Sequence, residues 1–159
     1  MPVIRLCTRV EAPAERVFDF ARSIDAHVAS TAGPSERAVA GVTSGLIGEG
    51  QGVTWEARHF GVKQRLTVKI TKMQRPSFFE DEMISGAFRR MHHHHEFIAF
   101  GSNTEMVDLF DFAAPLGPLG RVAELMFLTS YMRRFLTSRG EALKRIAESD
   151  EWRRYLKPG

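Results

Sequence analysis

The sequence RMHHHHEFIAFGSNTEMVDLFDF, residues 90–112, ends the segment that decides the fold. Its apolar and polar residues alternate on both sides of a Gly-Ser-Asn break, which is the pattern of two β-strands joined by a tight turn. Extended segments of this kind run back to Leu46. Sequential strands with short turns favour an antiparallel meander. The strands that we predict here span residues 52–60, 64–73, 77–85, 88–100 and 103–113.

The residues before this segment predict two short helices, with one further strand before them and another after them. Residues 3–11 alternate between apolar and polar side chains, as a strand with one wet face does. Pro13 then suits a first helical turn, and Ser23 is placed to cap a second short helix. Residues 36–43 are predicted as a short strand. The predicted sheet therefore has six to seven strands.

The residues after this segment predict one long helix. Pro115 ends the sheet pattern, and a helical pattern runs from about Pro118 to Glu148, apolar on most sides in its first half and amphipathic in its second. We predict an α+β fold with a curved antiparallel sheet around this helix. One domain spans residues 1–159, with residues 152–159 as a flexible tail. Between the sheet and the helix lies either a core of side chains or a ligand cavity.

Composition narrows the range of functions. The chain has 159 residues, 43% of them hydrophobic and 26% charged, which is typical of one globular domain. Its 22 basic and 19 acidic residues leave a net charge of +3, and the basic residues are scattered without interleaved aromatics. We therefore expect no nucleic-acid partner. No apolar run is long enough to span a membrane, so no stable membrane insertion is expected.

The N-terminal region and the cysteine content favour a cytoplasmic location. Cys7 is the single cysteine, so no intramolecular disulfide can form, and this suits a reducing compartment. The first residues lack the apolar run and cleavage site of a signal peptide.

The glycines between Gly41 and Gly52 lack the pattern of a phosphate or dinucleotide loop and lead into a strand. We therefore expect no cofactor.

Local motifs along the chain occur in a characteristic order. APAERVFDF (residues 12–20) resembles a strand-to-helix junction, and GEGQGVTWEARHFG (48–61) a hairpin. HHHEF (93–97) and TEMVDLFDFAAPLGPLG (104–120) resemble a His-x-His-x-Phe strand, a Thr-x-x-x-Asp element and a Pro-Gly entry into a last helix. RGEALK (139–144) matches an R-x-x-x-L ending. Together the motifs resemble the START-like, birch-pollen-allergen-like superfamily, also called SRPBCC, over nearly the whole chain.

Within that superfamily the chain resembles the small bacterial stand-alone proteins described as cyclase/dehydrase-like. The resemblance implies a helix-grip fold, with a cavity between the sheet and the long helix. Superfamily members bind lipids, sterols, polyketides or hormones, and a few catalyse cyclisation or dehydration. The fold alone does not choose among these functions.

Four consecutive histidines, residues 92–95, lie inside the predicted sheet. Side chains alternate along a strand, so His93 and His95 share a face with Phe97. A turn at Ser102-Asn103 would place this face beside the inner face of the next strand. The pairs that this register predicts are Phe97 with Asp108, His95 with Phe110 and His93 with Phe112. The shared face is mostly apolar with a few polar groups, as expected of a cavity lining.

Three interpretations of these histidines stay open. They are hydrogen-bonded residues of the sheet, polar groups of a ligand pocket, or metal ligands. His-x-His on one face has workable spacing for a metal, but a third ligand must come from Asp108 or elsewhere, and we expect no metal. Carboxylates that face a core are rare unless paired, so we expect Asp108 to orient a histidine or to bind a backbone group. His93, His95 and Asp108 are the candidates for catalysis.

The remaining candidates come from another strand and from the helix. Methionines suit an adaptable apolar pocket. On the strand at residues 77–85, the pattern leaves open whether Phe79 and Asp81 point inward. The histidine face supplies the ligand-binding candidates His93, His95, Phe97, Asp108 and Phe110. The other ligand-binding candidates are Trp55, His59, Met126, Tyr131 and Met132.

The sequence therefore predicts a protein that binds or transports a hydrophobic or amphipathic small molecule. An alternative is a cyclase or dehydratase that acts on a polyketide-like substrate in the same cavity, using His93 or His95 with Asp108. A second alternative is a non-enzymatic interaction module, in which the apolar front of the last helix forms a homodimer.

Overall fold

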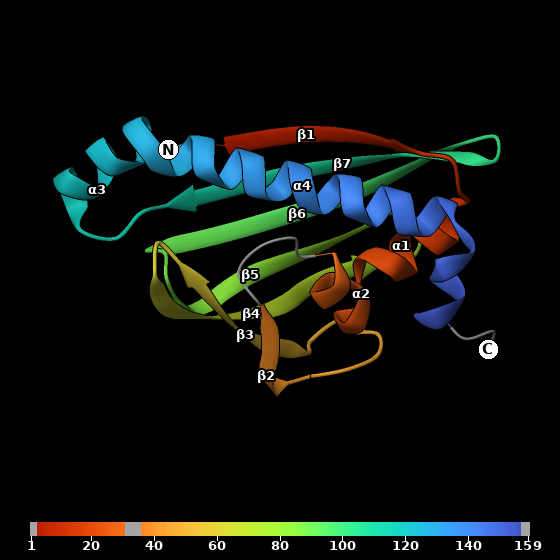
Figure 1. Ribbon diagram of the computed structural model, residues 1–159, viewed down its shortest axis with the longest axis horizontal. Helices are drawn as coiled ribbons and strands as arrows, with labels where there is room; N and C mark the ends of the chain where they lie inside the picture. Colours follow the sequence, from red (N-terminus) through yellow and green to blue (C-terminus); the bar gives the residue numbers. More distant parts are fainter. Residues whose placement is uncertain (1–2, 31–35, 157–159) are drawn as a thin grey trace.

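The sheet is an antiparallel meander, as predicted. The computed structural model describes residues 3–30 and 36–156. Its sheet has seven strands in the order β1-β7-β6-β5-β4-β3-β2 (Figure 1). From β2 to β7 each strand pairs with the next in the chain. The last strand, β7, also pairs with the first strand, β1. The strands are β1 (Val3–Val10), β2 (Arg37–Gly41), β3 (Gly52–His59), β4 (Val62–Gln74), β5 (Phe78–Gly86), β6 (Arg90–Phe100) and β7 (Asn103–Ala113).

Two short helices follow β1, and one long helical segment follows β7. The short helices are α1 (Ala14–Ala21) and α2 (Ile24–Ala29). Ser23 caps α2, because its Oγ accepts a hydrogen bond from the Ala26 N–H at 3.2 Å. The long segment consists of α3 (Gly117–Ala123), a π-helical stretch η1 (Glu124–Leu128) and α4 (Thr129–Glu148). The predicted long helix is confirmed, with one wider stretch that the sequence pattern did not indicate. No helix in the described residues could cross a membrane.

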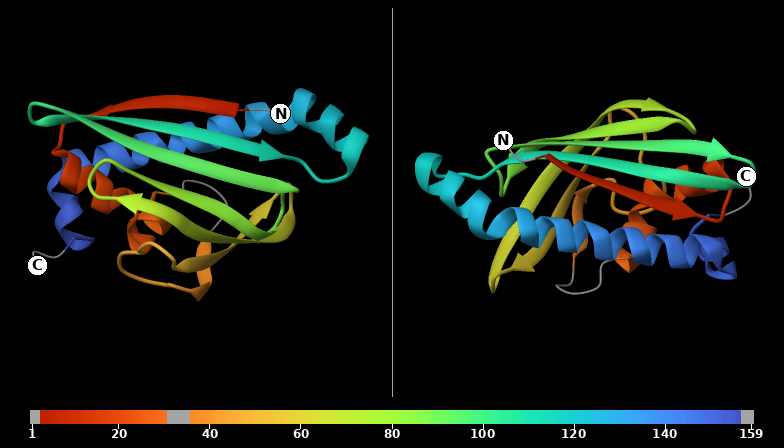
Figure 2. Two further views of the ribbon diagram at one scale, coloured as in Figure 1. Left: turned by 180° about the vertical axis from the view of Figure 1, so that it is seen from behind. Right: turned by 90° about the horizontal axis from the view of Figure 1, so that it is seen from above.

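The long helix crosses one face of the curved sheet. Figure 2 shows α4 lying along this face, with α1 and α2 beside its C-terminal half, whereas α3 extends beyond the sheet. Gly140 allows α4 to approach β1 closely, since a Cβ atom there would lie 3.3 Å from Thr8 Oγ1. Apolar side chains fill the region around α1, where Phe18 and Phe20 are fully buried.

The end of the chain packs more closely than predicted. After α4, η2 (Asp150–Arg154) forms a 3-10 helix. The predicted flexible tail began at residue 152, but Trp152, Tyr155 and Leu156 pack against the core. The reason is aromatic contact: the Tyr155 ring meets the edge of Phe20 with centroids 5.5 Å apart. Residues 157–159 lie outside the described part of the chain.

The hairpin between β6 and β7 has a different register from the predicted one. Phe97 pairs with Met106, His95 with Asp108 and His93 with Phe110. The two-residue turn is Gly101-Ser102 rather than Ser102-Asn103, because Gly101 adopts a φ of 61° at the first turn position, where glycine is favoured. The register is thus shifted by two residues, and a shift of two leaves every side chain on its predicted face.

Candidate functional site

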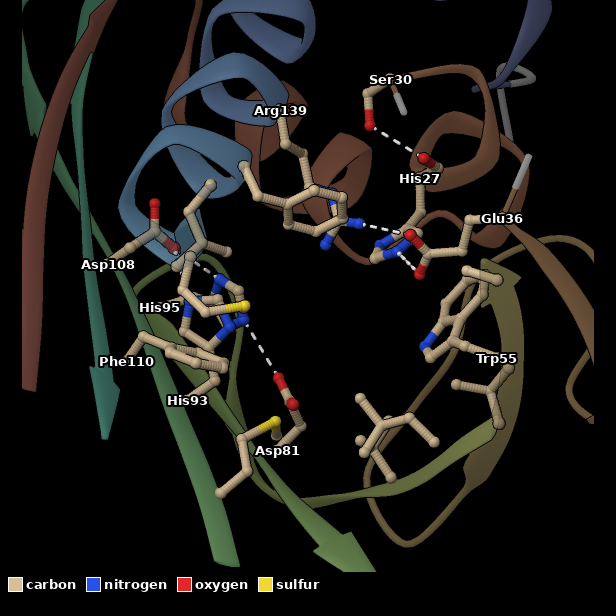
Figure 3. A pocket seen from close by; sticks show the side chains of 18 of the residues that line it. His27, Ser30, Glu36, Trp55, Asp81, His93, His95, Asp108, Phe110 and Arg139 are labelled. Atoms are coloured by element: carbon tan, nitrogen blue, oxygen red, sulfur yellow. Dashed lines mark hydrogen bonds and ion pairs between the residues drawn. The ribbon is translucent and has the colours of Figure 1, made fainter. Parts of the chain in front are cut away.

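A cavity of about 360 Å³ lies between the sheet and α4. This volume is within the range of small-molecule sites. Its wall is mostly apolar, and two groups of polar side chains interrupt it on different sides (Figure 3). The apolar wall includes Ile47, Val68, Ile70, Met106, Leu136 and Leu143.

The first polar group, here called the sheet-side group, consists of Asp81 on β5, His93 and His95 on β6, and Asp108 on β7. Its geometry follows from strand register, because Asp81 pairs with His93 and His95 pairs with Asp108. His95 lies between the two carboxylates, with Nδ1 2.8 Å from Asp108 Oδ1 and Nε2 3.0 Å from Asp81 Oδ2. His93 Nε2 lies 3.2 Å from the same Asp108 oxygen. The two imidazole rings lie against each other with centroids 3.8 Å apart.

Burial and hydrogen bonding change the pKa values of the two histidines of the sheet-side group in opposite directions. Burial disfavours a charged His95, but its hydrogen bonds with Asp108 and Asp81 overcome this and raise its pKa to about 9. Burial and the charge of His95 lower the pKa of His93. Burial would raise the pKa of both aspartates, yet the histidines that bond to Asp108 and Asp81 hold their pKa values below the usual range. At neutral pH two carboxylates therefore face one imidazolium and one neutral imidazole, which leaves one net negative charge.

The second polar group, here called the helix-side group, consists of His27 on α2, Glu36 before β2 and Arg139 on α4. Glu36 bridges the other two: its Oε2 accepts a hydrogen bond from Arg139 at 2.8 Å, and its Oε1 lies 3.0 Å from His27 Nε2. The His27 ring stacks on Trp55 with centroids 3.9 Å apart. Arg139 lies over the ring of Phe135. Among the side chains that the structure describes, Arg139 Nε is the one buried polar atom without a hydrogen-bond partner.

The charges of the helix-side group are also fixed by its contacts. Burial would raise the pKa of Glu36, but the charge of Arg139 and the hydrogen bond with His27 lower it to about 2. Burial and the charge of Arg139 lower the pKa of His27 against the opposing effect of Glu36. The ion pair of Glu36 with Arg139 is therefore formed at neutral pH, beside a neutral imidazole.

A third polar contact links the sheet to the helix. His59 Nδ1 on β3 lies 2.6 Å from the Tyr131 hydroxyl on α4. Burial lowers the pKa of His59 and raises the pKa of Tyr131, so both groups are neutral near pH 7. The Phe60 ring lies against Tyr131 with centroids 4.7 Å apart.

Solved structures share this architecture, whereas no protein-family model and no curated protein match the sequence. TTHA0849 from Thermus thermophilus is 18% identical with a TM-score of 0.75, over 92% of this chain and 97% of that one. The Zhui aromatase/cyclase from Streptomyces sp. R1128 is 16% identical with a TM-score of 0.74, over 99% and 98%. A START superfamily protein from Mycobacterium smegmatis is 10% identical with a TM-score of 0.62, over 92% and 94%. The chain has the START-like helix-grip fold. At these identities the likeness establishes the fold alone.

Most of the predicted ligand-binding residues line the cavity of this START-like fold. Phe97 is an exception, because it lies on the predicted face but packs in the core against Phe18 and Phe79. Met126 is another, because α3 and η1 extend beyond the sheet and leave its side chain 63% exposed. The predicted residues that line the cavity are Trp55, His59, His93, His95, Asp108, Phe110, Tyr131 and Met132.

Four residues of the two polar groups were not predicted from the sequence. Asp81 lies on the inward face of β5 with the buried Phe79, and this alternation was its one local signal. His27 and Glu36 are 9 residues apart, but Arg139 lies 103 residues beyond Glu36. No local pattern predicts their meeting.

Proposed function

We propose that this chain binds an amphipathic small molecule in the cavity between the sheet and α4. The observation that carries the proposal is a cavity of about 360 Å³ whose apolar wall is interrupted by polar groups on two sides. Apolar walls with a few placed polar groups are typical of ligand sites, because the apolar part supplies affinity and the polar part orients the ligand. The sequence also favours a ligand between the sheet and the long helix, and this agreement supports the proposal.

The helix-side group indicates one feature of the ligand. Arg139 lines the cavity, and its buried Nε–H has no hydrogen-bond acceptor among the described residues. A buried donor without a partner costs free energy, and an oxygen of a bound molecule would remove that cost. Glu36 holds the rest of the guanidinium in place at 2.8 Å. The ligand that we propose therefore carries a carbonyl, hydroxyl or carboxylate oxygen.

A matched pair of substitutions on the long helical segment tests the cavity. Met132 lines it, whereas Met126 is 63% exposed. Met132→Trp should fill the cavity and weaken binding of an apolar fluorescent probe by about tenfold or more, and Met126→Trp should leave binding unchanged. Both variants should keep the circular dichroism spectrum of the wild type. Strong destabilisation by Met132→Trp with unchanged probe affinity would mean that Met132 is simply core, since overpacking a core costs about 1–3 kcal/mol.

Native mass spectrometry of freshly purified protein tests the proposal without a substitution. A retained small-molecule mass of apolar composition supports it. A chain that carries no added mass, and that fails to bind any apolar probe after delipidation, contradicts it.

A cyclase or dehydratase is a second candidate, favoured by the hydrogen-bonded His–Asp pairs on the cavity wall. Cyclisation and dehydration need groups that take and return protons close to the substrate, and a carboxylate that holds an imidazole in one orientation assists this. His93 with Asp108 and His95 with Asp81 have such geometry. One similar structure is an aromatase/cyclase. Turnover of a polyketide-like substrate that His93→Gln abolishes while probe binding persists would establish the reaction.

The cytoplasmic location and the homodimer remain predictions from the sequence.

A further inference from the structure

Three potential metal ligands converge on the cavity wall. Asp81, His93 and His95 each offer one ligand atom, and these three atoms all lie within 4.8 Å of one another. Asp81 and His93 are buried, and His95 is half-buried. We infer that these three side chains form a binding site for a first-row divalent cation such as Zn²⁺. The sequence pattern placed two imidazoles on one face without identifying a third ligand. In the structure that third ligand is Asp81 on β5.

The donor set suits such a cation. Imidazole nitrogen and carboxylate oxygen bind Zn²⁺ at about 2.0–2.2 Å, and two ligands on a tetrahedral ion lie about 3.3 Å apart. His95 Nε2 and Asp81 Oδ2 are 3.0 Å apart, close to that spacing. Two histidines and one carboxylate are a recurrent set for first-row metals, which leaves positions for water or a ligand oxygen.

The sheet holds the three ligands in place without help from a loop. Asp81 pairs with His93 across β5 and β6, and His95 follows two residues along β6 on the same face. Their Cα positions are thus fixed by backbone hydrogen bonds, and only side-chain rotation is needed to bring the donor atoms together. Sites on strands are held more firmly than sites on loops.

Asp108 has the place of a residue that orients metal ligands. One of its oxygens accepts a hydrogen bond from His93 Nε2 at 3.2 Å and from His95 Nδ1 at 2.8 Å. The other ring nitrogens, Nδ1 of His93 and Nε2 of His95, are then the candidate ligand atoms, and on His95 the cation would replace the proton that Nε2 shares with Asp81. Carboxylates that bond to metal-binding imidazoles fix the tautomer and the ring orientation in this way. The arrangement is independent of the proposed ligand, because an apolar probe can occupy the cavity with or without a cation.

The same strand provides a matched control. His92 and His94 point to the opposite face of β6, where both lie near Glu80, with distances of 3.3 and 3.0 Å. This pair, here called the outer pair, has the residue type and strand of the proposed ligands without their burial. Weak metal binding by half-buried imidazoles outside the cavity would involve the outer pair, so variants of this pair separate the proposed site from such binding.

The experiment is a Co²⁺ titration of chelator-treated full-length protein, followed by visible absorption, with Zn²⁺ as competitor. We compare the wild type, Asp81→Asn and the double variant His92→Gln/His94→Gln. The wild type and the outer-pair variant should show saturable d–d bands at one equivalent that Zn²⁺ removes. Asp81→Asn should bind Co²⁺ at least tenfold more weakly. The melting temperature should rise with Zn²⁺ in the first two proteins and not in Asp81→Asn, because a ligand stabilises the state that binds it.

The opposite results overturn the inference. No saturable Co²⁺ binding by the wild type does so, and so does binding that survives Asp81→Asn but is lost in the outer-pair variant. If circular dichroism shows that Asp81→Asn does not fold, imidazole ¹⁵N shifts of the wild type decide the question. Zn²⁺ should move the His93 and His95 signals, whereas movement of the His92 and His94 signals alone contradicts the site. Failure of the cation site leaves apolar probe binding unchanged, so the two proposals are tested separately.

Discussion

The two polar groups of the cavity differ in whether all of their buried polar atoms have hydrogen-bond partners. In the sheet-side group, Asp108 accepts hydrogen bonds from two histidines and Asp81 bonds to one of them, so the side chains satisfy one another. In the helix-side group, Glu36 holds Arg139 and His27, but Arg139 Nε stays without an acceptor. A network in which every donor has a partner mainly stabilises its surroundings, whereas a network with an unpaired donor keeps one hydrogen bond that a ligand oxygen could complete.

This difference predicts where each substitution acts. Sheet-side residues sit on three adjacent strands at fixed register, so their loss should reduce folding stability first. Helix-side residues join α2, α4 and the chain before β2, so their loss should first change ligand affinity or the pH dependence of stability. Three measurements test this division, in order of decreasing effect.

The largest effect should follow Asp108→Leu. The substitution keeps the branched shape of the side chain but leaves the buried N–H groups of His93 and His95 without an acceptor. We expect the free energy of unfolding of the chelator-treated protein to fall by about 3 kcal/mol, measured by urea denaturation. The matched control is Glu80→Leu on the outer face of the sheet, where the histidine partners are partly exposed. There the loss should stay within about 1 kcal/mol. Equal losses in the two variants would show that the inner network is no more stabilising than a surface pair.

The next effect concerns pH and the helix-side group. The pKa of Glu36 is lowered from 4.5 to about 2 in the folded chain. Its ion pair therefore stabilises the fold above about pH 4.5, and this contribution is lost as the pH falls toward 2. Between about pH 6 and about pH 3 the wild type should lose about 2 kcal/mol more than Glu36→Gln, which lacks the titrating group. Urea denaturation of both proteins at the two pH values measures the difference. The same acid sensitivity in both would mean that Glu36 contributes no ion pair to folding.

The sheet-side group could be predicted largely from sequence, because alternation along a strand has a fixed period of two. The predicted hairpin register was wrong by two residues, yet His93, His95 and Asp108 still fell on one face. Asp81 escaped prediction because Phe78 and Phe79 are adjacent aromatics, and either could have marked the inward face. The structure decides this: Phe79 is 3% exposed and shares its face with Asp81.

The helix-side group and the end of the long helix could not be predicted in this way. Glu36 and Arg139 meet only through the packing of α4 across the sheet, and nothing local records that contact. Met126 and Met132 belong to the same apolar helical pattern, but Met126 is 63% exposed and Met132 is 8% exposed. A helical pattern shows which residues are apolar, and only the neighbouring elements decide which of them are covered.

The smallest effect should follow Arg139→Lys, and it is the sharpest test of the division. Lysine keeps a positive charge for Glu36 but has no counterpart of the Nε–H that lies in the planar guanidinium. We expect stability to change by less than about 1 kcal/mol. We expect affinity for a fluorescent fatty acid to fall about tenfold, or about 1.4 kcal/mol, because one hydrogen bond to its carboxylate is lost. A hydrocarbon analogue of the same probe is the control, since it has no oxygen for Arg139 and should bind both proteins equally. If the substitution weakens both probes alike, Arg139 shapes the cavity wall. If it weakens neither, the unpaired Nε–H does not contact the ligand, and the helix-side group has no part in binding it.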